Sequence, residues 1–212
     1  MGSRIPGIFN LGGDLSHFAE KIRARDLNAL RRYGHLCVEA IHGNSEAFKA
    51  AAVTIALVQG DAPGGCACAL ACDTILADRS AEFGLPELLF NLFPGMGAYS
   101  FLSRRVGPVQ AERMITSGRL YSAEGLHTLG PVDVLAEDGK GEAAVRDHID
   151  RNDRKHNALQ RRLPRAAPRQ SRHPRRTARH RRELERDGAR RQRARHSQDA
   201  AADGGAAGPG GG

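Results

Sequence analysis

Two apolar patterns with helical spacing open the chain. After Asp14, apolar residues recur at three- and four-residue steps (Leu15, Phe18, Ile22), and a second such stretch follows Asp26. Aspartate is a favoured N-cap because its carboxylate accepts hydrogen bonds from unpaired amides of the first helical turn. The spacing therefore predicts one helix after Asp14 and another after Asp26.

Residues 51–60, AAVTIALVQG, form a continuous apolar run that ends at a glycine. Such a run is typical of a strand covered on both faces of a sheet. We predict further strands over 73–78 and 131–137, and helices over 66–72, 97–107, 108–118, 122–130 and 142–159, with Pro86 breaking the segment 81–90. Strands that alternate with helices define the α/β class.

Charge divides the chain into two unlike parts. The full chain carries +8, but residues 161–212 hold 15 Arg, no Lys and 5 acidic residues, a net of 15 − 5 = +10. Residues 1–160 carry the other 17 basic and 19 acidic side chains, a net of −2. The nearly neutral body gives no electrostatic reason to expect nucleic acid as a partner.

The tail, residues 160–212, has only Leu163 and Leu184 as large aliphatic side chains. It cannot bury enough apolar surface to offset chain entropy, so we predict a domain over 1–159 and a disordered tail. The tail is rich in Arg, Ala, Pro, Gly and His and contains no Lys. GC-rich codons give this mixture when they are read in a shifted frame, so we hypothesise a frameshift near residue 160. A genuine Arg-rich arm that binds RNA or DNA is the alternative.

Targeting and metal signals are missing from the sequence. No apolar run approaches the roughly 20 residues of a membrane span, and the N-terminus matches neither a signal peptide nor a myristoylation signal. Cys37, Cys66, Cys68 and Cys72 lie among small apolar residues without a neighbouring histidine. We interpret them as buried reduced thiols, and we expect a soluble cytoplasmic protein with no metal and no membrane partner.

The segment PGGCACALACD (63–73) places a glycine turn between a strand and an apolar helix. A dinucleotide site has the same order of elements, but APGGCA is not G-x-G-x-x-G and no acidic residue follows at the usual distance. Amides at the start of a helix favour an oxygen that carries negative charge. We therefore predict an anion or oxyanion site of another kind.

Three segments together resemble the crotonase (enoyl-CoA hydratase/isomerase) superfamily: FNLGGDL (9–15), IALVQGDAPGGCACALACDTILAD (55–78) and FGLPELLFNLFPGMGAYSFLSRRVG (83–107). The first segment and LPELLFNLFPGMGAYSF look closest to the diffusible-signal-factor synthases, which make cis-2-unsaturated fatty-acid signals. The resemblance implies a ββα superhelix, a homotrimer or hexamer, and an acyl thioester of CoA or acyl carrier protein as substrate. It also implies that strands and a helix preceding the first glycine motif are missing, so the fold would be truncated at the N-terminus.

The resemblance also assigns the site. It implies that the N–H groups of Gly13 and Gly64 form an oxyanion hole, that Glu87 is the catalytic acid–base, and that Leu11, Gly12, Gly65 and Pro86 line the substrate site. Two backbone donors stabilise enolate charge on a thioester oxygen, and losing one such donor typically costs about 3 kcal/mol. A carboxylate that follows an apolar stretch is partly desolvated, which raises its pKa toward the working range of an acid–base group.

One position departs from the family pattern. The second catalytic glutamate of the family, 20 positions before Glu87, is Ala67 here. A methyl group cannot move a proton, and the loss of one acid–base group typically costs about 10²–10⁴ in rate. Hydration uses both carboxylates, whereas some isomerases of the superfamily use one at the position of Glu87. The signal-synthase resemblance implies dehydration of a 3-hydroxyacyl thioester and thioester cleavage; a degenerate homologue with little catalysis is the alternative.

Overall fold

The computed structural model describes residues 1–155 and 157. Its helices are α1 (Leu15–Arg23), α2 (Leu27–Ser45), α3 (Cys66–Leu70), α4 (Ala98–Val106), α5 (Pro108–Ser117), α6 (Ala123–Leu129) and α7 (Gly141–Asn152), with 3₁₀ turns η1 (Ala47–Lys49), η2 (Pro86–Phe90) and η3 (Asp153–Lys155). Its strands are β1 (Ile55–Val58), β2 (Thr74–Asp78), β3 (Glu82–Gly84), β4 (Leu120–Ser122) and β5 (Val134–Ala136). The predicted tail, 160–212, lies outside the described residues.

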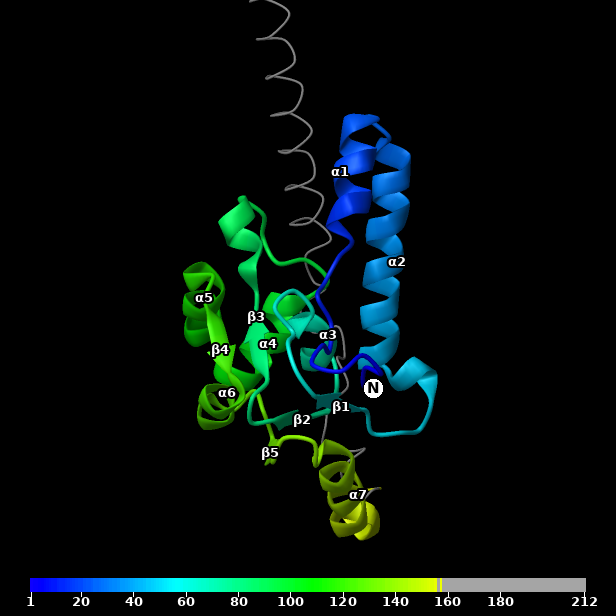
Figure 1. Ribbon diagram of the computed structural model, residues 1–212. Helices are drawn as coiled ribbons and strands as arrows, with labels where there is room; N and C mark the ends of the chain where they lie inside the picture. The colour runs from blue at the N-terminus through cyan, green and yellow to red at the C-terminus, as the bar shows by residue number, and fades with distance from the viewer. Residues whose placement is uncertain (156, 158–212) are drawn as a thin grey trace, which may run out of the picture. The chain divides into compact units, whose positions relative to one another are not determined.

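A parallel sheet of order β1-β2-β5 organises the body, with β2 in the centre. Leu76 of β2 pairs with Leu57 on one side and with Val134 on the other. β3 and β4 form a separate antiparallel pair, and a bridge between Ala62 and Phe83 links this pair to the turn after β1. Helices α3 to α6 share one buried core with β1, β2 and β3, while α7 packs on β1 and β2 (Figure 1). The alternation confirms the predicted α/β class.

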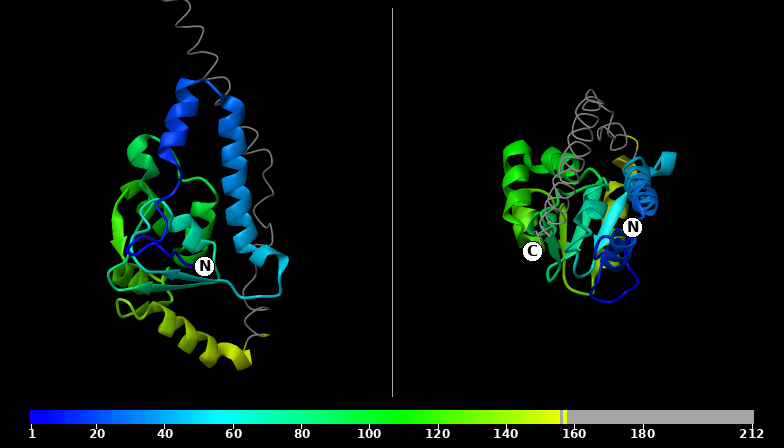
Figure 2. Two further views of the ribbon diagram at one scale, coloured as in Figure 1. Left: turned by 45° about the vertical axis from the view of Figure 1, so that its right-hand side comes forward. Right: turned by 90° about the horizontal axis from the view of Figure 1, so that it is seen from above.

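Helices α1 and α2 form an antiparallel hairpin, and the end of α2 contacts α3 (Figures 1 and 2). The predicted N-cap at Asp26 is confirmed, because its side chain accepts a hydrogen bond from the Ala29 N–H at 2.9 Å. Asp14, where a helix was predicted to begin, caps α1 in the same way by accepting the His17 N–H at 2.9 Å. No residue of α1 is buried, and Leu15 is 69% exposed. None of the helices within residues 1–155 has both the length and the hydropathy for a bilayer crossing.

Several predicted elements differ from the structure at their ends, three of them most clearly. β1 covers only four residues of the predicted 51–60 strand, since its pairing to β2 starts where the Thr54 carbonyl accepts the Thr74 N–H at 3.1 Å. Helix α3 ends at Leu70 instead of 72, and α7 gives way to a 3₁₀ turn after Asn152. Of the predicted helix 142–159, residues 156, 158 and 159 lie outside the described part.

Two further features correct the sequence analysis. β3 and β4 were not predicted, because each has only three residues with no clear periodicity, and pairing with each other defines them as strands. All four cysteines are free thiols, but only Cys66 and Cys72 are buried. Cys37 and Cys68 are half-buried, which corrects the prediction that all four are buried.

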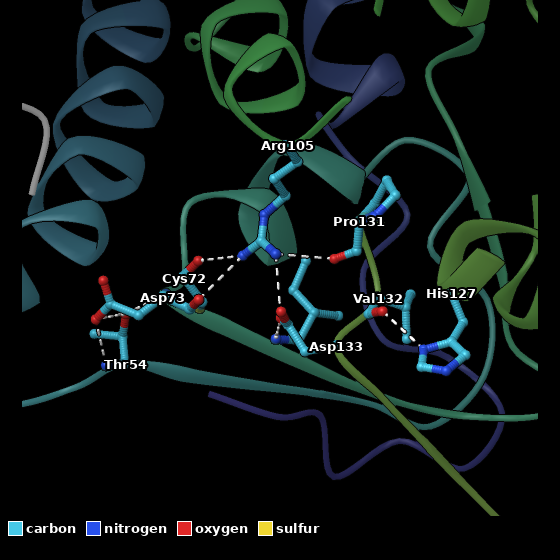
Figure 3. A network of polar contacts seen from close by, with 9 residues as sticks. Thr54, Cys72, Asp73, Arg105, His127, Pro131, Val132 and Asp133 are labelled. Carbon is cyan, nitrogen blue, oxygen red and sulfur yellow. Dashed lines mark hydrogen bonds and ion pairs between the residues drawn. The ribbon is translucent and has the colours of Figure 1, made fainter. Parts of the chain in front are cut away.

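Arg105, in the last turn of α4, ties three elements together (Figure 3). Its guanidinium donates hydrogen bonds to the carbonyl oxygens of Cys72 (2.8 Å) and Pro131 (3.0 Å), and to the Asp133 carboxylate (3.1 Å). The same carboxylate accepts the Ile75 N–H at 2.7 Å. These bonds join the start of β2 to the segment that leads into β5, and the guanidinium's planar fork suits several acceptors at once.

Replacing Arg105 should destabilise the protein. Arg105→Ala leaves the partly buried carbonyls and the Asp133 carboxylate without their cationic partner, so we expect the free energy of unfolding to fall by about 2–4 kcal/mol in urea denaturation. Arg104→Ala, at the neighbouring exposed position, is the control and should cost less than about 1 kcal/mol. Equal effects of the two substitutions would contradict this role for Arg105.

Candidate active site

The first glycine motif lies alongside the turn that follows β1. Ile8 and Asp61 form a parallel bridge. The Asp61 N–H donates to the Gly7 carbonyl, and the Phe9 N–H donates to the Asp61 carbonyl, both at 2.9 Å. These bonds bring residues 9–13 against residues 61–65, although about 50 positions separate them in the sequence.

Glycines permit the contact between these two segments. A Cβ built on Gly64 would lie 2.4 Å from the Leu11 carbonyl oxygen, and one on Gly65 would lie 2.3 Å from the Cβ of Asn10. A Cβ on Gly12, whose φ is +97°, would lie 2.7 Å from the Gly64 carbonyl oxygen. Backbone therefore packs directly on backbone here, and any side chain at these three positions would separate the segments.

The two amides predicted to form the oxyanion hole are open. Within residues 1–155, neither the Gly13 N–H nor the Gly64 N–H donates a hydrogen bond to another protein group. Both glycines are half-buried, and Gly65 caps α3 without a side-chain hydrogen bond. Partly buried amides without acceptors stabilise negative charge on an incoming oxygen.

Glu87 lies in the first turn of η2, which follows β3. The Ala62 N–H donates to the Glu82 carbonyl at 2.7 Å and the Gly84 N–H donates to the Ala62 carbonyl at 3.2 Å, so β3 is fastened beside the turn at 63–65. The Oε2 atom of Glu87 is buried and has no hydrogen-bond partner in the described residues. Burial raises the pKa of Glu87, partly offset by its own backbone N–H.

The segment before Glu87 runs beside the glycine turn. A Cβ built on Gly84, three residues before Glu87, would lie 3.0 Å from the Pro63 carbonyl oxygen. Cys66 is the first residue of α3 and follows Gly65 directly. Burial raises the pKa of the Cys66 thiol to about 12, and the negative charge of Glu87 contributes to the same increase.

The remaining predicted residues are also placed. Leu11 contacts Gly64 through its carbonyl, while its side chain is 60% exposed. Pro86 opens η2 and is half-buried, and Ala67 is buried in the first turn of α3. Among the described residues no second carboxylate contributes to the pKa of Glu87. The roles of these residues stay predictions.

Two residues next to the glycines were missed by the sequence analysis. Asn10 accepts the Gly12 N–H at 2.7 Å through its Oδ1, and the Tyr33 hydroxyl accepts the Asp14 N–H at 2.9 Å. Asn10 offered a weak local signal, since asparagine often bonds the amide two residues later. Tyr33 lies on α2, far from the motif in sequence, and no spacing rule would have identified it.

Solved structures with a similar arrangement of helices and strands show which fold the protein has. An enoyl-CoA hydratase from Bacillus anthracis is 24% identical with a TM-score of 0.64 over 71% of this chain and 56% of that one, a likeness that shows the fold. DspI from Pseudomonas aeruginosa is 29% identical with a TM-score of 0.63 over 88% of this chain and 74% of that one. The protein is thus an α/β protein with the crotonase-like fold.

Sequence comparison names the family. The family model for enoyl-CoA hydratase/isomerase matches residues 1–187, and the chain belongs to that family. The match continues past residue 159, where the sequence analysis places the end of the domain.

Curated relatives agree with this family. A 2,3-dehydroadipyl-CoA hydratase of Escherichia coli K12 is 37% identical over 132 residues, which are 61% of this chain and 48% of the relative. A short-chain-enoyl-CoA hydratase of Clostridioides difficile is 39% identical over 85 residues, 40% of this chain and 55% of the relative. The chain thus spans about half the length of the curated relatives it matches.

The glycine contact makes a direct prediction. Gly64→Ala should force residues 10–12 away from the turn and lower the free energy of unfolding by about 1–3 kcal/mol. Gly34→Ala is the control, since its Cβ would meet nothing within 4 Å and alanine favours a helix by up to about 1 kcal/mol. Urea denaturation measures both variants, and wild-type stability for Gly64→Ala would contradict the contact.

The pKa of Glu87 predicts a pH-dependent stability. The folded state raises the pKa of Glu87 above its ordinary value of 4.5. The stability that the Glu87 side chain contributes is therefore complete at a pH below 4.5, and it is lost as the pH rises through the folded pKa. Glu87→Gln does not titrate at position 87, so its stability should increase relative to wild type as the pH rises above 4.5. Denaturation curves across this range test the sign, with Glu39→Gln on the exposed side of α2 as the control; a relative gain that shrinks with rising pH would contradict it.

Proposed function

We propose that the protein binds an acyl thioester of CoA or acyl carrier protein and moves a proton at the carbon next to its carbonyl. The Gly13 and Gly64 amides would donate to the thioester oxygen, and Glu87 would exchange the proton. One observation carries the proposal: two half-buried amides have no acceptor, and a buried carboxylate oxygen without a donor follows the strand that is bonded to the glycine turn at Ala62. The family membership supports the choice of thioester.

The chemistry follows from these groups. Removal of a Cα proton places negative charge on the thioester oxygen, and preorganised amides stabilise it where water is partly excluded. A raised pKa makes Glu87 a stronger base toward a weak carbon acid than an ordinary carboxylate. In a 3-enoyl thioester, Glu87 would take the Cα proton and return it to Cγ, which shifts the double bond to Cα–Cβ.

Ala67 favours this one-carboxylate reaction over hydration. Addition of water across Cα–Cβ needs a group that activates the water as well as one that handles the Cα proton. The side chain at position 67 is a buried methyl group, 3% exposed, and does neither. We therefore place double-bond isomerisation before hydration.

Exposed apolar side chains next to the site residues support an acyl ligand. Five large apolar side chains are each at least 60% exposed: Leu11 beside Gly12, and Leu89, Phe90, Leu92 and Phe93 after Glu87. Exposed large apolar side chains on both motifs favour a ligand or a partner that covers them. An acyl chain entering between the two motifs would bury part of this surface.

A second candidate is the synthesis of a cis-2-unsaturated fatty acid. Its support is the likeness to DspI over 88% of this chain, together with the segments FNLGGDL and LFPGMGAYSF. In this reaction Glu87 would take the Cα proton of a 3-hydroxyacyl thioester and pass it to the departing β-hydroxyl, giving a 2-enoyl thioester and water. Water would then cleave the thioester to a free acid and the carrier thiol.

Proton exchange tests the proposed function. In deuterium oxide the protein should exchange the Cα protons of octanoyl-CoA, and Glu87→Gln should lower the rate by about 10²-fold or more. Mass spectrometry measures the exchange, and the same samples supplied with 3-hydroxyacyl-CoA reveal any free 2-enoic acid. Exchange that persists in Glu87→Gln would overturn the assignment of Glu87.

Ala67→Glu is the matched gain-of-function variant. Restoring the second carboxylate should raise the hydration of a 2-enoyl-CoA at least about tenfold while Glu87 is present, and should have no such effect with Glu87→Gln. The double variant is therefore the control. Unchanged hydration in Ala67→Glu would instead favour a degenerate homologue with little catalysis.

A further inference from the structure

Of three consecutive amides at the first glycine motif, the outer two donate hydrogen bonds to side chains and the middle one does not. The Gly12 N–H donates to the Asn10 side chain at 2.7 Å, and the Asp14 N–H donates to the Tyr33 hydroxyl at 2.9 Å. The Gly13 N–H, between them, meets no acceptor within residues 1–155. Side chains thus satisfy the amides on both sides of the one that the proposed function needs.

Tyr33 reaches this motif from α2. Its ring contacts Phe18 edge to face, with centroids 5.0 Å apart, and stacks obliquely on His17 at the same distance. Its hydroxyl would lie 3.8 Å from a Cβ on Gly13, and the Cε2 of Phe18 would lie 2.9 Å from that position. The aromatic contacts hold the hydroxyl at the start of α1, where it fixes the direction of the Asp14 amide.

Asn10 connects the two halves of the site. Its Oδ1 accepts the Gly12 N–H while its Nδ2 donates to the Sγ of Cys68 on α3 at 3.2 Å. Its Cβ also occupies the space above Gly65. The Asn10 side chain therefore fixes the backbone conformation of the turn that contains Gly13, and it also fixes the distance between this turn and the start of α3.

We propose that Asn10 and Tyr33 are positioning residues that hold the Gly12 and Asp14 amides, so that of these three consecutive amides only the Gly13 N–H is directed at the substrate oxygen. This inference rests on the proposed function of Gly13 and Gly64. The two side chains act through the backbone and do not touch the reacting atoms. Loss of either allows the motif to rotate, which weakens polarisation of the thioester carbonyl while the ring contacts or the glycine contact still support binding.

The carbonyl resonance of a bound thioester tests the proposal. With saturating [1-¹³C]octanoyl-CoA, the wild-type protein should move the ¹³C carbonyl signal downfield because hydrogen bonds polarise the carbonyl. Tyr33→Phe keeps the aromatic contacts and should reduce this shift by about half or more, as should Asn10→Ala. Tyr121→Phe, which also loses one hydroxyl contact, to Ser117 at 3.1 Å, should keep the full shift.

The outcomes separate the two claims. A full downfield shift in both Tyr33→Phe and Asn10→Ala overturns the positioning roles and leaves the oxyanion amides in place. No shift in the wild-type protein overturns the oxyanion hole itself, and the positioning roles with it. Melting temperatures confirm that each variant is folded, and calorimetry confirms saturation before the shifts are compared.

Discussion

Direct packing of backbone on backbone, between residues 10–12 and 64–65, is the constraint on which the site depends. A Cβ built on Gly12, Gly64 or Gly65 would lie less than 3 Å from the nearest atom of the opposite segment. None of these positions can therefore carry a side chain unless the two segments move apart. The contact joins the start of the α1–α2 hairpin to the turn after β1 and leaves the Gly13 and Gly64 amides without acceptors. Everything proposed about function requires that contact to persist in solution.

The rest of the body holds this contact in place. The turn at 61–65 is fixed on one side by residues 7–9 and on the other by β3, whose bonds to Ala62 also hold the segment that leads to Glu87. Arg105 fastens the amino ends of β2 and β5 at the far end of the sheet. In the proposed reaction, Glu87 would have to be both base and acid because position 67 holds no carboxylate, which favours reactions that move one proton over reactions that also activate water.

Local signals in the sequence predicted much of this arrangement. The structure confirms the helices predicted to begin at Asp14, Asp26 and Ser122, and the one predicted between Pro108 and Gly118. Signals of this kind are local: a capping side chain bonds a free amide of the first turn, and proline and glycine suit the backbone at the two ends of a helix. The glycine motifs were identified by resemblance. β3 and β4, the half-buried state of Cys37 and Cys68, and the contacts of Tyr33 were missed, since each depends on a partner distant in sequence and no local periodicity encodes it.

A crystal structure with a bound saturated acyl-CoA tests the central claim most directly. The account predicts that the thioester oxygen lies about 3 Å from the amide nitrogens of both Gly13 and Gly64, with Cα facing the Glu87 carboxyl. A thioester bound elsewhere, or one whose oxygen meets neither amide, would contradict it.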